Sequence, residues 1–180
     1  MLADRRSRLR GILGEGISLR TRCAVQRPKA QRLLHTVSMK FSVHIPFVEL
    51  LGFELLSMAD GQAEIAFAPQ PEHENSFSVV HGGASMTLMD VVMAHAARSV
   101  EPSMGVVTIE MKTSFMRPAK GPLLSKGKLL HRTATMAFTE ASIFDSANRL
   151  CAHATGTFKY VPRLPVGPGN TQPLNTIRTD

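Results

Sequence analysis

The sequence predicts an α+β domain in which one long helix packs against a curved, mostly antiparallel sheet. Only residues 82–100 form a long segment whose apolar side chains recur at helical spacing. The segments around it are short, rich in strand-forming residues and separated by turn residues. A chain of 180 residues with 43% hydrophobic residues is long enough for one domain with a substantial core.

The elements before and within the long helix follow from local patterns. Residues 45–52 (IPFVELLG) predict a short helix with Pro46 in its first turn, where a missing N–H costs nothing. Residues 53–59 and 62–69 flank an Asp-Gly turn dipeptide and predict a hairpin. On the long helix, one apolar face is formed by Ala84, Leu88, Val91, Val92 and Ala96.

Four strands are expected after the helix. Residues 106–116 (VVTIEMKTSFM) alternate in polarity, which is typical of a strand with one buried face. Its apolar face is predicted to carry Val107, Ile109, Met111 and Phe115, and its polar face Thr108, Glu110, Lys112 and Ser114. Residues 123–132, 136–145 and 150–160 predict three further strands with short turns between them. Because these strands are consecutive, we expect them to form a meander.

Charge and composition separate the two ends from the domain. Residues 1–38 hold nine basic and two acidic residues, which account for the whole net charge of +7. We therefore predict a basic arm over residues 1–39, a working domain over 40–161 and a flexible, proline-rich tail over 162–180. The arm fits three hypotheses: contact with an anionic surface or nucleic acid, a targeting segment, or an extension upstream of a start at Met39.

The cysteines and the apolar runs exclude several classes of protein. Cys23 and Cys151 lie far apart and form neither a metal-binding spacing nor a disulfide framework, which suits a reducing compartment. No apolar run is long enough to span a bilayer. We expect a cytoplasmic protein with no metal, no cofactor, no membrane partner and no nucleic acid bound by its domain.

The stretch HGGASMTLMD, residues 81–90, places Asp90 among apolar neighbours of the long helix. A buried carboxylate without a partner costs several kcal/mol or changes its pKa. One interpretation is a structural hydrogen bond to a neighbouring loop. The other is a general base or nucleophile whose basicity is raised by partial desolvation.

The glycines that open the helix favour the catalytic interpretation. Gly82 and Gly83 lie where the first helical N–H groups have no partners, so these groups can hold a carbonyl oxygen that gains negative charge. Eight residues of helix separate Gly82 from Asp90, about 12 Å of rise. That distance is too long for one small reacting group, so we predict a homodimer in which the acid of one copy faces the glycine of the other.

Two longer segments, NSFSVVHGGASMTLMDVVMAHAA and VTIEMKTSFMRPAKG, carry a family resemblance. Asn, then HGG six residues later, then Leu-x-Asp on the helix resembles the hotdog-fold thioesterases. The resemblance is to the PaaI-like acyl-CoA thioesterase group of the 4-hydroxybenzoyl-CoA thioesterase superfamily. It covers about residues 40–161 and implies a hotdog fold, in which a curved, mostly antiparallel sheet wraps one long central helix.

The resemblance also implies roles for five residues. Asp90 matches the catalytic acid, which activates water or attacks the thioester carbon directly. Gly82 matches the glycine whose N–H polarises the thioester carbonyl. His81 is expected to orient groups at the site, Asn75 to support it and Thr108 to help place the attacking water. In the family, the acid and the glycine of one site come from opposite subunits, in agreement with the distance argument.

Further substrate contacts are expected from Gly83, Met86, Arg117 and Lys120. Met86 could line an acyl channel with two later methionines, although methionines at helical spacing also serve simply as core. The cations that follow the first strand after the helix could bind coenzyme A phosphates or belong to a solvated surface. They are Arg117, Lys120, Lys126 and Lys128.

The resemblance thus implies hydrolysis of an aryl- or short- to medium-chain acyl-CoA to the free acid and CoA. The alternative is a hotdog module that binds or senses acyl-CoA without turnover. A hotdog-fold dehydratase would need an Asp/His arrangement that the sequence lacks. Attack through water or through an anhydride, and a dimer or a dimer of dimers, both stay open at this point.

Overall fold

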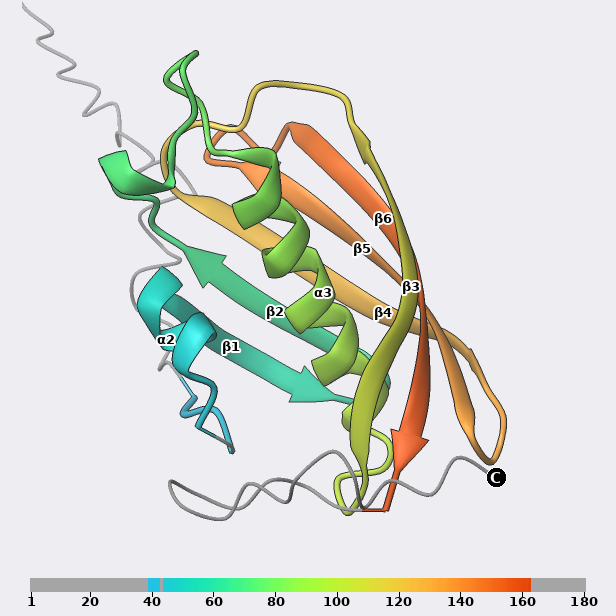
Figure 1. Ribbon diagram of the computed structural model, residues 1–180. Helices are drawn as coiled ribbons and strands as arrows, with labels where there is room; N and C mark the ends of the chain where they lie inside the picture. The colour runs from blue at the N-terminus through green and yellow to red at the C-terminus, as the bar shows by residue number, and fades with distance from the viewer. Residues whose placement is uncertain (1–38, 43, 163–180) are drawn as a thin grey trace, which may run out of the picture.

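A computed structural model describes residues 39–42 and 44–162 of the chain (Figure 1). The predicted basic arm up to residue 38 and the predicted tail from residue 163 lie outside the described residues. The elements, in chain order, are α2 (Pro46–Leu51), β1 (Phe53–Ala59), β2 (Gln62–Phe67), a 3-10 turn (Pro71–His73), α3 (Gly82–Arg98), β3 (Gly105–Phe115), β4 (Leu123–Arg132), β5 (Met136–Asp145) and β6 (Leu150–Val161).

The six strands form one antiparallel sheet in the order β1-β2-β4-β5-β6-β3. The sheet curves around α3, which crosses its concave face (Figure 1). Strands β4, β5 and β6 form the expected meander, but the prediction that β3 joins it by pairing with β4 is wrong. One edge of β4 is taken by β2, so β3 pairs with β6 and becomes the edge strand. Residues 116–122 return the chain from that edge to β4.

The short elements before α3 confirm the local predictions. Helix α2 begins at Pro46, ends at Leu51 and is capped by Gly52, whose φ of 68° is left-handed and suits a residue without a Cβ. Between β1 and β2, Asp60 and Gly61 have φ angles of 49° and 75°. Two positive φ angles in a two-residue connection match the twist of a hairpin, and aspartate and glycine tolerate them.

Helix α3 buries the apolar face that the sequence predicted, with Leu88, Val92 and Ala96 at 0% exposure. It lies close to the sheet at Gly127 of β4, where an added Cβ would lie 2.6 Å from the carbonyl oxygen of Val92. Because Gly127 has no side chain, the backbone of α3 can pack directly against β4 at this position. Among the described residues no helix, α3 included, has the length and apolar character needed to cross a membrane.

Strand β3 contains a β-bulge that the sequence pattern did not indicate. Thr108 lies opposite Phe158 on β6, and Glu110 lies opposite the next residue of β6, Thr157. Ile109 is therefore an extra residue without a partner on β6. A bulge of this kind shifts the alternation of side chains by one position from there on.

The bulge separates a first half of β3, where the predicted faces are reversed, from a second half, where they hold. Thr108 points to α3 and bonds to a helix side chain, although strict alternation placed it on the polar face. Beyond the bulge, Met111 packs against the core and Phe115 contacts the start of α3. Val107 and Ile109, which were expected to be buried, are 42% and 55% exposed.

Candidate active site

Asp90 lies in the third turn of α3, half-buried, where the helix runs beside β3. The hydroxyl Oγ1 of Thr108 donates a hydrogen bond of 2.7 Å to its Oδ1. Burial raises the pKa of the Asp90 carboxyl above its ordinary value of 3.8, and the hydrogen bond from Thr108 opposes that rise. The partner is thus a strand hydroxyl rather than a loop, and the carboxylate is a stronger base than an exposed aspartate.

The start of α3 is capped by His81. Its Nδ1 accepts a hydrogen bond of 2.9 Å from the Gly83 N–H, so Nδ1 carries no proton and the neutral ring is protonated at Nε2. The backbone N–H of His81 donates to the carbonyl of His73 at 2.8 Å, which ties the cap to the preceding 3-10 turn. Among the described residues, the Gly82 N–H has no hydrogen-bond partner. Of the two glycine donors, Gly82 is the open one.

Asn75 organises the loop that leads into the helix. Its Oδ1 accepts a hydrogen bond of 2.9 Å from the Phe77 N–H, and its own N–H donates to the carbonyl of Val79. Ser78 in the same loop has a φ of 51°, a left-handed conformation that such tight turns require. Asn75 therefore helps to set the path of the chain toward His81.

The structure gathers the predicted site residues into two separate groups. Thr108 joins Asp90 near the middle of α3, while His81, Gly82 and Gly83 form its first turn. Two turns of helix lie between the groups. One chain therefore holds both halves of the predicted site, but at different positions along the same helix.

A residue that the sequence did not single out, Phe115, lies against the second group. If Gly82 carried a Cβ, that atom would lie 3.4 Å from Cζ of the Phe115 ring. The ring is 55% exposed. Alternation along β3 predicted the side of the sheet on which the ring lies but not its exposure, which depends on the place of β3 at the edge of the sheet.

The three methionines of α3 differ in accessibility. Met89 and Met93 are fully buried and belong to the core, whereas Met86 is 38% exposed. Met86 lies one turn from both Gly82 and Asp90 on α3, because four residues bring a side chain back to the same face. Of the three, only Met86 is placed to touch a ligand at the surface.

The predicted cations do not form one cluster. Arg117 and Lys120 are exposed in the connection between β3 and β4, and Nη1 of Arg117 donates to the carbonyl of Leu150 at 2.9 Å. Lys126 lies on β4 and pairs with Glu64 of β2 at 2.8 Å. The structure thus leaves Arg117 and Lys120, together with the exposed Lys128 of β4, as the candidates for an anionic group.

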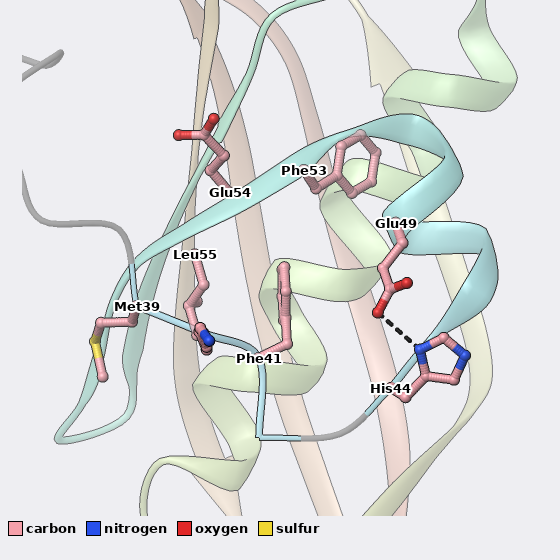
Figure 2. Close-up of a pocket in the computed structure, with 8 residues that line it drawn as sticks. Met39, Phe41, His44, Glu49, Phe53, Glu54 and Leu55 are labelled. Atoms are coloured by element: carbon pink, nitrogen blue, oxygen red, sulfur yellow. Dashed lines mark hydrogen bonds and ion pairs between the residues drawn. The ribbon is translucent and has the colours of Figure 1, made fainter. Parts of the chain in front are cut away.

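A hollow of about 360 Å³ lies between α2, β1 and residues 39–42. Figure 2 shows His44 and Glu49, joined by a 2.8 Å contact, on one side of the hollow and Met39 on the other. None of its lining residues belongs to either group of the predicted site. Within the described ranges, no three His, Cys, Asp or Glu side chains are grouped so that they could hold a metal ion.

Comparison with known proteins covers the segment that holds most of these residues. The pattern of the thioesterase superfamily matches residues 77–152, which include the start of α3, Asp90 and Thr108. The Saccharolobus solfataricus protein "Putative esterase SSO2140" is 30% identical over 119 residues, 66% of this chain and 84% of that protein. Human acyl-coenzyme A thioesterase 13 is 29% identical over 104 residues, 56% of this chain and 74% of that protein.

Solved structures agree with the architecture. The protein PA5202 of Pseudomonas aeruginosa superposes with a TM-score of 0.64 at 30% identity, covering 67% of this chain and 97% of that one. Zebra fish thioesterase superfamily member 2 gives a TM-score of 0.56 at 27% identity, covering 59% and 80%. Escherichia coli PaaI, at 20% identity, gives a TM-score of 0.62 and covers 66% of this chain and 86% of that one. At this identity the likeness shows the fold alone. The chain belongs to the thioesterase superfamily and has its hotdog fold.

Proposed function

We propose that the protein hydrolyses an aryl- or short- to medium-chain acyl-CoA to the free acid and CoA. Membership of the thioesterase superfamily supports thioester hydrolysis in general. The observation that carries the specific proposal is the half-buried carboxylate of Asp90, made more basic by burial and held by Thr108. A thioester is already activated toward attack, so one base and one electrophilic N–H suffice.

In the proposed reaction Asp90 acts as the general base. Thr108 holds Oδ1, and Oδ2 takes a proton from a water molecule as the water oxygen bonds to the thioester carbon. The carbonyl electrons move onto oxygen, where the Gly82 N–H at the positive end of α3 stabilises the negative charge. When the oxyanion collapses, the C–S bond breaks, and the CoA thiolate leaves with the proton that Asp90 had taken from water, which restores the base. His81 keeps the helix start in shape, and Asn75 keeps the loop before it in place.

The proposed site needs two copies of the chain. Asp90 and Gly82 lie eight residues apart on one helix, about 12 Å along its axis, so one carbonyl cannot reach both in a single copy. Strand β3 is an edge strand, and its exposed Val107 and Ile109 are typical of an edge that pairs with another chain. We therefore assign Asp90 and Thr108 of one copy and Gly82 of the other to each site in a homodimer, whether it stands alone or within a dimer of dimers.

The remaining contacts follow from accessibility. Met86 is the exposed methionine between the two groups and offers an apolar surface to the acyl chain. Gly83 contributes the second residue without a side chain at the helix start, which lets a ligand approach the backbone. Arg117 and Lys120 supply positive charge for the CoA phosphates.

The substitution Asp90→Asn tests the proposal. It keeps the shape of the side chain and removes the base, so kcat for thiol release from acyl-CoA should fall by about 100-fold or more. Asp60→Asn is the matched control, because Asp60 lies in the turn between β1 and β2 with a φ of 49° that asparagine also tolerates. A thiol-release assay over a panel of acyl-CoAs gives both rates. Hydrolysis by Asp90→Asn at the wild-type rate would remove Asp90 from the mechanism.

The same variant should not lose activity through unfolding. Because burial raises the pKa of Asp90 above 3.8, protonation of this group favours the folded state. That stabilisation is complete below pH 3.8 and is lost as the pH rises through the folded-state pKa. At pH 7 the charged carboxylate therefore destabilises the fold, and Asp90→Asn should melt at a higher temperature than the wild type. The difference should shrink as the pH approaches 3.8.

A further inference from the structure

Phe115, the last residue of β3, is a half-exposed aromatic ring beside the open N–H of the helix start. The atoms of the ring nearest to Gly82 are Cζ, Cε1 and Cε2, at 3.4, 3.7 and 3.8 Å from the position of an added Cβ. These atoms form the far tip of the ring, so the side chain points end-on at the helix backbone. Counted from Thr108, which faces α3, the one-residue shift at Ile109 is what brings Phe115 to the same face.

The position of the ring gives it access to whatever the Gly82 N–H binds. A carbonyl oxygen bound to that N–H lies about 2.9 Å from the nitrogen, so the carbonyl carbon and the first acyl carbon lie within a few ångströms of the Gly82 backbone. The tip of Phe115 occupies the space beside the same backbone. Met86, one helical turn further on, is the other exposed apolar side chain on this face of α3.

The chemistry of the ring selects the acyl side of the substrate. A phenyl ring offers apolar surface and a π-face but no donor, acceptor or charge, which matches a hydrocarbon acyl group. The phosphates of CoA need cations, and the structure supplies these separately at Arg117 and Lys120. In the single chain the ring is also 55% exposed, so the chain itself leaves this apolar surface uncovered.

We propose that Phe115 is a specificity-determining residue whose ring contacts the acyl group next to the thioester carbonyl and favours aromatic over small acyl groups. The inference rests on the proposed function, since it takes Gly82 as the donor to the carbonyl. In each two-chain site, Phe115 and Gly82 come from one copy and Asp90 from the other. An aromatic acyl group packs against the ring, whereas an acetyl group has only a methyl to offer.

The test compares phenylacetyl-CoA with acetyl-CoA. Phe115→Ala should lower kcat/KM for phenylacetyl-CoA by about tenfold and for acetyl-CoA by less than about twofold. Phe115→Leu keeps an apolar side chain at the strand end, so its ratio of kcat/KM for phenylacetyl-CoA to that for acetyl-CoA should be intermediate. This variant replaces the alanine variant in the test if the latter folds poorly. Phe138→Ala, at a 40% exposed phenylalanine on β5, is the matched control and should change neither rate. Equal losses for both substrates would overturn the proposal.

A binding measurement separates this inference from the proposed function. In 2-oxo-3-phenylpropyl-CoA and 2-oxopropyl-CoA, a methylene lies between sulfur and carbonyl, so hydrolysis is impossible and calorimetry gives the dissociation constants directly. Phe115→Ala should raise the dissociation constant of 2-oxo-3-phenylpropyl-CoA about tenfold more than that of 2-oxopropyl-CoA. The dissociation constant of free CoA should stay unchanged. Weaker binding of free CoA, or no change in the ratio, contradicts the role of Phe115. If Phe115→Ala weakens binding of the phenyl ligand selectively, as predicted, but the wild type releases no thiol from acyl-CoA, the proposed hydrolysis fails while the acyl contact stands.

Discussion

At Asp90, two neighbouring influences act on one carboxyl group in opposite directions. Burial raises its pKa, and the hydrogen bond from Thr108 lowers it, with burial the larger effect. Burial makes Asp90 a stronger general base, because a higher pKa means a higher proton affinity. The hydrogen bond from Thr108 keeps the carboxylate charged at neutral pH. The apolar neighbours of Asp90 were visible in the sequence. The resemblance predicted Thr108 only as a residue that places the attacking water; its hydrogen bond to Asp90 is a finding of the structure, since simple alternation turned Thr108 outward.

This balance predicts the effect of Thr108→Val. Valine has nearly the same shape but cannot donate, so the pKa of Asp90 should rise further. Because a protonated Asp90 accepts no proton, the acidic limb of the pH profile of kcat/KM should move to higher pH. Thr157→Val is a suitable control, since its hydroxyl bonds to Glu110 on the exposed side of β3. A limb that stays in place or moves to lower pH would contradict the assigned role of Thr108.

Among the elements, local patterns predicted those whose signals are local. The hairpin around Asp60 and Gly61 and the amphipathic helix α3 each follow from a turn dipeptide or a period of apolar residues. The position of β3 at the β6 edge, and the bulge at Ile109, depend on which strand pairs with it, and a strand's own sequence does not encode that choice. Val107 and Ile109 were therefore expected in the core and are found exposed.

The contact between α3 and β4 predicts a difference between two glycines. In Gly127→Ala the new Cβ would lie 2.6 Å from the backbone oxygen of Val92, so the helix itself must move. In Gly156→Ala the close atoms belong to the side chains of Met93 and Phe158, and the methionine tip can move aside. Urea unfolding should show a loss of about 1–3 kcal/mol for Gly127→Ala and a smaller loss for Gly156→Ala. The reverse order would mean that the helix is not fixed by this backbone contact.

For the whole molecule, the central point is that α3 carries both halves of the proposed site two turns apart. The sequence alone predicted two copies, because the helical rise between Gly82 and Asp90 can be calculated without coordinates. The structure adds an edge strand with exposed Val107 and Ile109 on which a second copy can pair. How the copies are arranged could not be predicted from the sequence, since an interface depends on two surfaces at once.

Mixing two inactive variants tests this two-chain site most directly. Asp90→Asn removes the base, and Gly82→Val fills the space beside the N–H donor, so each variant alone should be nearly inactive. When they are refolded together in equal amounts, half of the dimers should be mixed, and each mixed dimer holds one intact site, so activity should recover to about a quarter of the wild type. If the mixture is no more active than the two variants measured separately, the acid and the glycine do not act across subunits.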